Sequence, residues 1–435
     1  MKIKIIAALF VAVIALSILS LPTPREESAK NSNSFILGPV NIFDGETISK
    51  AAYVEVLDGY IKDLHMEQPD SQLRKVDGQN RWLVPGLIDA HVHAWGDALE
   101  QSLERGVTTV IDMFGHPNFL RQHQPQRATT KFSRKADIFG AGSLITAPNG
   151  HGTQYGIEVS TLSKPPDAKK LIKQRINAGS DFIKIVYTRT GSAYAHAPSI
   201  SEQGLQAAIR AAHKQNYLAV VHIADHDSAL DAVEAGADGL VHSFFDQPVS
   251  DELLALLKIN GVFVIPTMTV YEGMLRGSIN DEILLNNKTL KISASAKSTL
   301  NRNFPNSGRF PEHFYTNLLT NTKRMHNAAI PILAGSDAPN PNTAHGWSLL
   351  VELLLFQEAG MPTETILKSA TSIPADSFSL EDRGRIREGM KADFLLLEKS
   401  PYKDLKTILE PLRVWKNGYL VSSKDSARNH QINNY

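Results

Sequence analysis

The chain has 435 residues, with 45 Lys+Arg against 45 Asp+Glu and a sequence isoelectric point near 7.3. No overall charge of one sign is available to attract nucleic acid or an acidic membrane surface, so we expect a small neutral or zwitterionic partner. The absence of cysteine excludes thiol nucleophiles, thiolate metal sites and disulfides.

The first 30 residues are predicted to be a signal peptide or an N-terminal membrane anchor. Lys2 and Lys4 precede an apolar run of 17 residues from Ile5 to Leu21, a length between the two classes. No A-x-A cleavage site closes the run, so cleavage stays open. A buried helix is the alternative, disfavoured because the run is terminal and flanked by lysines. We therefore expect an exported protein, periplasmic or extracellular, with a membrane tether if the segment is retained.

Both ends of the remaining chain are predicted to be rich in β-strands. Residues 31–83 carry the turn signals Asp44-Gly45 and Asp58-Gly59 between apolar stretches, and residues 384–435 carry Asn417-Gly418 in RVWKNGYLV. The two ends are predicted to form one small β-sandwich domain.

The middle of the chain, residues 84–383, alternates short apolar strands with amphipathic helices. An opening strand ending in HVH is followed by seven more, predicted at 107–113, 137–145, 181–187, 218–223, 238–243, 261–266 and 330–335. Eight β/α alternations predict an α/β fold of TIM type, a (β/α)8 barrel with its reactive face at the carboxyl ends of the strands. An open doubly wound sheet is the alternative, but the sequence has no G-x-G-x-x-G after a first strand.

A long insert, residues 271–311, is a candidate lid. It holds six basic residues against three acidic ones, a balance that suits a substrate carboxylate. A solvated helical face is the alternative.

Residues 84–96, VPGLIDAHVHAWG, place two histidines at the end of the opening strand. Alternation along a strand directs His91 and His93 to the same side, and two converging neutral imidazoles suit a transition metal. A pair of partly buried structural histidines is the alternative.

In the fourth strand, FIKIV surrounds Lys184 with apolar residues. Burial lowers a lysine pKa and frees the amine to form a carbamate with carbon dioxide, unless the side chain snorkels to solvent.

Three further strand ends carry a single polar residue of related chemistry. LAVVHI ends at His222, GLVHS presents His242, and PILAGSDAPN places Asp337 after two small residues. Each one alone is explained by a structural histidine or a helix-capping aspartate. Together, H-x-H, K, H, H and D on five strand ends favour a metal site.

This order of residues resembles the amidohydrolase superfamily, in particular its prolidase-like and imidazolonepropionase-related branch with a carboxylated lysine and a binuclear metal centre. WLVPGLIDAHVH, HDSALDAVEAGADGLVHS, AGSDAP and the tail EDRGRIREGMKADFLLLEKSPYKDLKTI carry the resemblance over nearly all of residues 35–422. It implies a TIM-type barrel beside a β-sandwich from both chain ends.

The resemblance also implies roles for the strand-end residues. His91 and His93 would hold the more buried metal with Asp337, the carbamate of Lys184 would bridge, and His222 with His242 would hold the second ion. Two divalent metal ions, zinc first and manganese, cobalt or iron as substitutes, would supply an activated hydroxide. Asp337 would serve as catalytic general acid/base during cleavage of a C–N amide bond in a dipeptide, an N-acyl amino acid or a cyclic amide.

Two other functions stay open. A mononuclear deaminase or an imidazolonepropionase-like ring-opening hydrolase would use one metal; the acid Asp225 follows His222, but as HxxD rather than HxxE, and those branches lack the strand-four lysine. A metal-free binding protein is the second alternative. His151 and Tyr187 occupy positions where the family meets substrate, although each also suits a loop or packing role. Whether the protein is an oligomer stays open.

Overall fold

The computed structural model describes residues 32–193, 195–276, 292–304 and 310–423. The predicted signal or anchor segment therefore lies outside the described residues. Within the described part of the chain, no helix is long and apolar enough to cross a membrane.

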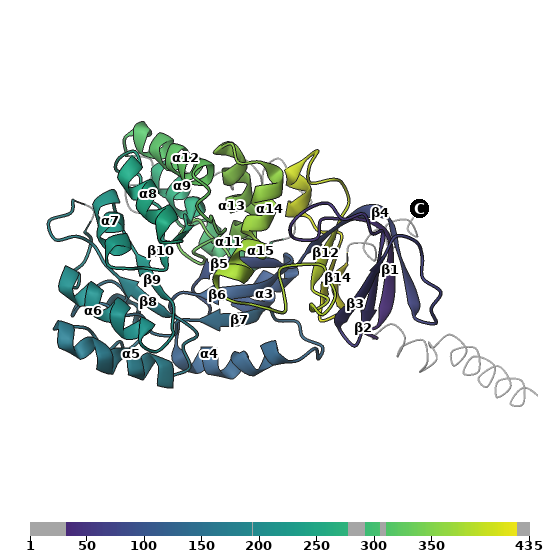
Figure 1. Ribbon diagram of the computed structural model, residues 1–435, viewed down its shortest axis with the longest axis horizontal. Helices are drawn as coiled ribbons and strands as arrows, with labels where there is room; N and C mark the ends of the chain where they lie inside the picture. Colours follow the sequence, from purple (N-terminus) through teal and green to yellow (C-terminus); the bar gives the residue numbers. More distant parts are fainter. Residues whose placement is uncertain (1–31, 194, 277–291, 305–309, 424–435) are drawn as a thin grey trace, which may run out of the picture.

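The two chain ends build one seven-stranded sheet at one end of the molecule (Figure 1). Its strand order is β14-β13-β12-β4-β1-β2-β3, and only the β1–β4 pair is parallel. The strands are β1 (Phe35–Ile42), β2 (Tyr53–Leu57), β3 (Tyr60–His65), β4 (Arg74–Pro85), β12 (Phe394–Leu397), β13 (Arg413–Lys416) and β14 (Tyr419–Ser423). The joining of both chain ends agrees with the sequence prediction, whereas a two-layer sandwich stays a prediction.

The predicted turn signals close two hairpins of this sheet. Asp58-Gly59 joins β2 to β3 and Asn417-Gly418 joins β13 to β14, with positive φ at all four residues. Two consecutive residues of positive φ match the right-handed twist of the flanking strands, which is why Asp-Gly and Asn-Gly are favoured there.

The middle of the chain forms two parallel sheets. One has the order β5-β6-β7 and the other β11-β10-β9-β8. Their strands are β5 (Leu87–Val92), β6 (Val107–Asp112), β7 (Asp137–Gly140), β8 (Ile183–Val186), β9 (Ala219–His222), β10 (Gly239–Val241) and β11 (Phe263–Ile265). Seven of the eight predicted strands therefore correspond to observed strands.

The eighth predicted strand, residues 330–335, is not a continuous strand. Ile332 makes a parallel bridge to Val264 of β11, and Ala338 makes one to Val92 of β5. A further parallel bridge, Ile145 to Ile185, connects the segment after β7 to β8. These isolated bridges lie where a ring of eight strands would need them, although a continuous closed sheet is not detected.

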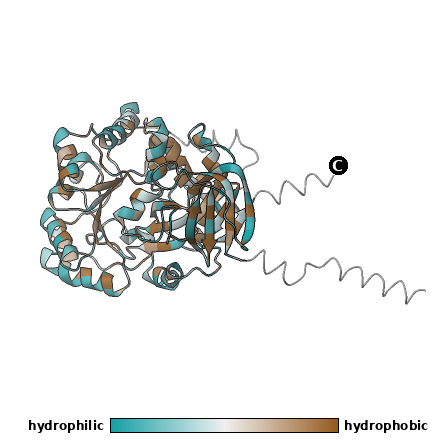
Figure 2. Cartoon of the chain, turned by 45° about the vertical axis from the view of Figure 1, so that its right-hand side comes forward, coloured by the Kyte–Doolittle hydropathy of each residue, from teal (hydrophilic) through white to brown (hydrophobic). Residues whose placement is uncertain are grey.

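Helices lie around the parallel strands (Figure 1), with their hydrophobic residues largely toward the interior (Figure 2). They are α3 (Ala98–Glu104), α4 (Pro117–His123), α5 (Ala168–Asn177), α6 (Glu202–His213), α7 (His226–Glu234), α8 (Asp251–Ile259), α9 (Met268–Leu275), α11 (Ala294–Leu300), α12 (Glu312–Asn327), α13 (Trp347–Glu358), α14 (Thr363–Ser369) and α15 (Ser372–Ser377). Helices that follow strands in this way place the loops at the carboxyl ends of the strands on one face.

The predicted lid is only partly within the described residues. Its first residues, Tyr271–Leu275, belong to α9 and are mostly buried, so the insert begins later than predicted. Of its six basic residues, Arg276 pairs with Glu358 at 2.9 Å, which removes it from the expected recognition of a carboxylate. Residues 277–291 and 305–309 lie outside the described part.

A buried group of charges joins the end sheet to β7. Asp137 Oδ2 lies 2.7 Å from Lys416 Nζ and 2.8 Å from Arg383 Nη1, and Lys416 also contacts Asp393 Oδ2 at 2.6 Å. Although burial opposes ionisation, Lys416, Arg383 and Lys391 hold the pKa of the Asp137 carboxyl well below its usual range. Paired charges in this position fix the end sheet against the amino ends of the parallel strands.

Candidate metal centre

The predicted residues lie at the carboxyl ends of the parallel strands. His91 is the second-last residue of β5, and His93 directly follows that strand. Lys184 lies in β8, and His222 is the last residue of β9. His242 comes directly after β10. All but His93 are less than a tenth exposed, so the strands deliver polar side chains into the interior.

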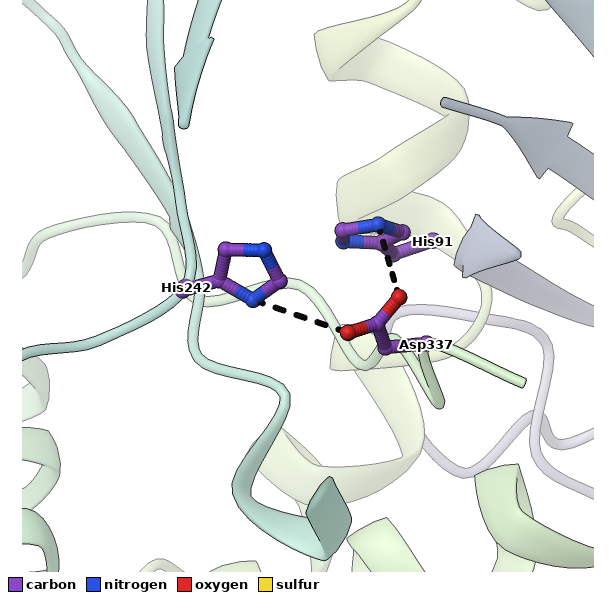
Figure 3. A group of neighbouring side chains, drawn as sticks. All are labelled: His91, His242 and Asp337. Carbon is purple, nitrogen blue, oxygen red and sulfur yellow. Dashed lines mark ion pairs between the residues drawn. The ribbon is translucent and has the colours of Figure 1, made fainter. Parts of the chain in front are cut away.

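Asp337 is the centre of the group. Its Oδ1 lies 3.2 Å from His91 Nε2 and 3.0 Å from His93 Nε2, and its Oδ2 lies 3.9 Å from His242 Nδ1. Figure 3 shows the carboxylate between the rings of His91 and His242. One ligand atom from each of His91, His242 and Asp337 lies within 4.8 Å of the others, a spacing that a single metal ion can span.

The imidazole rings form a continuous series. Ring centroids are 5.3 Å apart for His93 and His91, 4.9 Å for His91 and His242, and 4.5 Å for His242 and His222. The four histidines predicted from sequence are therefore neighbours, but His242, rather than His93, completes the compact group with His91 and Asp337.

The backbone at two of these positions adopts the left-handed region. His242 has φ 73° and Asp337 has φ 51°, conformations that non-glycine residues rarely take. Such backbone persists only where surrounding structure imposes it, and it is concentrated at functional sites. The segment before Asp337 is packed closely against β5: a Cβ on Gly335 would lie only 2.8 Å from His91 Cβ.

Burial favours the neutral form of His91, His222 and His242, whereas at His93 burial is outweighed by the hydrogen bond and charge of Asp337, which raise the pKa. Burial lowers the pKa of His91 to about 3, and burial together with neighbouring imidazoles lowers the pKa of His222 and His242 well below its usual value. Against the effect of burial, His91, His93 and His242 hold the pKa of Asp337 well below its usual range. The arrangement supplies neutral nitrogens and one carboxylate, the protonation states in which these side chains bind a metal.

Lys184 is buried among the same groups. It is 3% exposed, and desolvation lowers its pKa to about 7 despite the opposing charge of Asp337. A lysine of this pKa is largely unprotonated at slightly alkaline pH, so its amine is available for carbamate formation.

The donors fit a bound cation. Both ring nitrogens of His91 and Oδ1 of Asp337 are buried without a hydrogen-bond partner among the described residues. Unpartnered buried polar atoms are costly unless another group satisfies them. A hydrogen bond fixes the neutral tautomer of His93, because its Nδ1 donates to the Phe114 carbonyl at 3.0 Å. The Nε2 atom, which lies on the side of Asp337, then keeps its lone pair for a metal ion.

His151, predicted as a substrate contact, lies beside the metal residues. Its ring is stacked on His222 at 4.9 Å, and its Nδ1 is 2.8 Å from His196 Nε2. The sequence analysis did not single out His196, an exposed residue that the loop after β8 brings onto His151. Nothing in the spacing of this loop signals that contact.

Tyr187 is placed differently. Its buried hydroxyl donates to Asp231 Oδ2 at 2.7 Å, on α7, and Arg189 pairs with the same carboxylate. The backbone of Tyr187 contacts His222, but its hydroxyl is engaged by Asp231, and these contacts favour the packing alternative. Asp225, the acid of the HxxD pattern, caps α7 by accepting from Ser228 N at 2.7 Å.

His345 is a second histidine that the sequence analysis did not single out. It is 6% exposed, neither ring nitrogen has a partner among the described residues, and its ring meets Trp95 edge-on at 6.5 Å. Burial lowers its pKa to about 3, with a smaller effect of His93. The HGW sequence around it carries no motif that predicts this burial.

Comparisons with known proteins agree with this arrangement. Residues 82–421 match the amidohydrolase family. Aspergillus niger ochratoxinase is 22% identical over 436 aligned positions, covering 87% of this chain and 84% of the relative. A 5-methylthioadenosine/S-adenosylhomocysteine deaminase of Bacillus cytotoxicus is 23% identical over 388 positions, covering 80% of each chain.

Solved structures show the same fold. A Xaa-Pro dipeptidase with methionine in its active site superposes with a TM-score of 0.70 at 21% identity, covering 89% of this chain and 99% of the other. The crystal structure of A. niger ochratoxinase gives 0.69 at 18% identity, covering 90% and 96%. These neighbours imply an α/β fold of TIM-barrel type. The predicted family is confirmed: the chain belongs to the amidohydrolase family and is a hydrolase.

Proposed function

We propose that the protein is a metal-dependent amidohydrolase that cleaves a C–N amide bond in a small molecule such as a dipeptide, an N-acyl amino acid or a cyclic amide. The observation that carries the proposal is the meeting of His91, His242 and Asp337, whose ligand atoms lie within 4.8 Å of one another. Relatives named for hydrolysis, ochratoxinase and a Xaa-Pro dipeptidase, support this reaction class.

His91, His93 and Asp337 would hold one divalent ion, and His222 with His242 a second, with Lys184 as a carbamate between them. Nitrogen and oxygen donors without thiolate make zinc the first choice, with manganese, cobalt or iron as substitutes. When bound, such ions polarise a carbonyl and lower the pKa of water.

The side chains of the chain itself would orient the substrate and move a proton. The Asp337 carboxylate, central in the group and ionised, is suited to accept a proton and return it to the leaving nitrogen. His151 lies at the edge of the same group, where it would contact the substrate carbonyl or carboxylate.

A mononuclear deaminase or a ring-opening hydrolase of imidazolonepropionase type is the second candidate. A deaminase is among the relatives, but the acid that follows His222 is occupied as the cap of α7, which disfavours a proton-transfer role for Asp225. A metal-free binding protein is disfavoured by the complete set of ligands.

The finer architecture belongs to the same proposal. Residues 84–383 would form a closed (β/α)8 barrel, residues 31–83 with 384–435 a β-sandwich, and the part of the insert after α9 a lid. Residues 1–30 would direct export to the periplasm or the extracellular space, with a membrane tether if they are retained.

The test is metal analysis of the purified chain combined with a hydrolysis screen of dipeptides and N-acyl amino acids. We expect about two divalent ions per chain, turnover that a chelator abolishes and zinc restores, and loss of turnover in Asp337→Asn. Asp251→Asn is the control, because Asp251 is the first residue of α8, does not belong to the candidate metal centre and has a side chain that is 95% exposed. Metal-loaded protein that releases ammonia from amines and cleaves no amide would contradict the proposal in favour of deamination.

A further inference from the structure

The described chain begins at one hairpin of the end sheet. Asn33 O accepts a hydrogen bond from Gly59 N at 3.1 Å, and Ser34 Oγ accepts one from Asp58 N at 2.9 Å. Residues 1–31, with the apolar run Ile5–Leu21, therefore precede a point fixed against the β2–β3 turn. About twelve residues separate the run from Asn33, which limits the tether to about 40 Å.

Exposed hydrophobic side chains surround this point. We call Leu57, Tyr60 and Phe132 the basal patch; their exposed fractions are 40%, 40% and 53%. Leu57 and Tyr60 are directly paired across the β2–β3 hairpin, so their side chains lie on the same face. Phe132 meets Tyr419 of β14 edge-on at 5.5 Å.

The parts of the basal patch are held together by close backbone contacts. A Cβ placed on Gly59 would lie 2.8 Å from Thr130 Cβ and 2.7 Å from the Asn417 carbonyl oxygen. Asn417 Nδ2 donates to Lys131 O at 2.9 Å. The β2–β3 turn, the β13–β14 turn and the loop before β7 therefore meet where the chain enters.

Cations accompany the aromatic residues. Lys131 and Arg134 are exposed on either side of Phe132, and the Arg134 guanidinium lies 5.9 Å from the Phe132 ring centre. Asp58 is an exposed acid at the same turn. Exposed aromatic and aliphatic side chains flanked by Lys and Arg are the composition of surfaces that enter the headgroup region of an anionic bilayer. The neutral balance of the whole chain does not exclude this local excess.

The basal patch and the candidate metal residues lie at opposite ends of the parallel strands. The loop that carries Phe132 precedes β7 and thus lies at the amino ends of the parallel strands, whereas His91, His222 and Asp337 lie at the carboxyl ends. Contact through the basal patch turns the candidate site away from the surface that the patch touches.

We propose that the basal patch rests on the surface of an anionic lipid bilayer, beside the point where the N-terminal segment would enter it. A bilayer is the occupant because the 31 preceding residues include a run of 17 apolar ones and because the flanking exposed cations complement anionic headgroups. The inference goes beyond the proposed reaction and does not depend on it.

The absence of cysteine allows a direct test, because a single introduced thiol is the only labelling site. The full chain carrying Leu57→Cys with a nitroxide label is reconstituted with vesicles of phosphatidylcholine and phosphatidylglycerol. We expect the label to become several-fold less accessible to a water-soluble relaxation agent and more accessible to oxygen. The control is Tyr155→Cys: Tyr155 is 56% exposed and its ring lies 6.3 Å from that of Phe114, beside the candidate site, so the label there should stay accessible to water.

A second variant tests the charges. In the Leu57→Cys background, Lys131→Glu with Arg134→Glu should reduce the shielding several-fold on these vesicles, while hydrolysis of a soluble amide is unchanged. Equal water accessibility at positions 57 and 155 would overturn the proposal, as would shielding that occurs without vesicles through self-association. Shielding that survives the double charge reversal would overturn the assignment to anionic lipid. Loss of hydrolysis in unmutated protein with normal shielding would instead affect only the proposed function.

Discussion

Asp89 and Ser336 are joined by two hydrogen bonds although 247 positions separate them in sequence. Ser336 N donates to Asp89 Oδ1 at 2.9 Å, and Ser336 Oγ donates to Oδ2 at 2.6 Å. Because the first residue lies on β5 two positions before His91 and the second directly precedes Asp337, this pair fixes the distance between imidazole and carboxylate. Sequence reasoning did not single out Asp89.

We expect Asp89→Ala to destabilise the protein by about 3 kcal/mol, because it leaves the buried Ser336 donors and His91 N without an acceptor. Metal content should fall with stability. Asp89→Asn retains one acceptor oxygen and should lose about 1 kcal/mol. Urea unfolding and elemental analysis measure both effects; equal values for the two variants would contradict the positioning role.

Lys184→Ala should lower metal content and turnover together, because it removes the proposed bridging group. Short carboxylic acids should restore part of both by entering the space left behind. Lys184→Met is the matched control, since it removes the amine but fills the space, and it should resist rescue. Unchanged metal content in Lys184→Ala would exclude a bridging lysine.

His196→Asn should reduce kcat/KM about 2- to 10-fold, the effect of one lost hydrogen bond, because His196 positions His151 against His222. Steady-state kinetics on a substrate from the screen measure it, with metal content unchanged. His313→Asn, at an exposed position of α12, should have no effect. If His196→Asn has the same kinetics as the wild type, the His196–His151 contact has no role at the substrate site.

Asp225→Asn should retain both the cap of α7 and the hydrolase activity, whereas Asp225→Ala should cost about 1 kcal/mol of stability with turnover preserved. Thermal unfolding and an amide hydrolysis assay separate the two effects. Activity abolished in the stable Asp225→Asn variant would indicate a proton-transfer role and support the deaminase alternative.

Asp137→Asn should destabilise the protein by about 3–5 kcal/mol, because Lys416 and Arg383 remain buried without their shared carboxylate. The partly exposed pair Lys368–Glu364 is the control, and Glu364→Gln should cost less than about 0.5 kcal/mol. The folded pKa of Asp137 is lowered, so its contribution is present above the unfolded pKa of about 3.9 and is lost as pH falls below it. Urea unfolding at several pH values should therefore show the difference from wild type shrinking only in acid.

The sequence predicts most of the parallel strands and the main site residues because both depend on local patterns. Short apolar runs identify β8, β9 and β10, and a predicted site residue lies in or directly after each, namely Lys184, His222 and His242. The Asp-Gly and Asn-Gly pairs identify two hairpins for the same local reason.

The remaining features depend on contacts between distant residues. The run PILAGS predicts a strand, but this segment pairs with β11 and β5 only through separate bridges at Ile332 and Ala338. His196 and His345 come to the site on loops whose paths are fixed elsewhere in the fold. Lys416 would be expected in solvent, and its burial follows from a carboxylate 279 positions away.

The pairing of β4 with β12 has a consequence for the newly made chain. Strands β12, β13 and β14 come from the last part of the described sequence, so the end sheet cannot assemble until synthesis has passed them. Until then Asp137 also lacks Lys416 and Arg383, and a truncated product would hold an uncompensated negative charge at the base of its strands. A truncated chain is therefore expected to be less stable than the full one, and quality-control proteases would encounter it as a loosely folded intermediate.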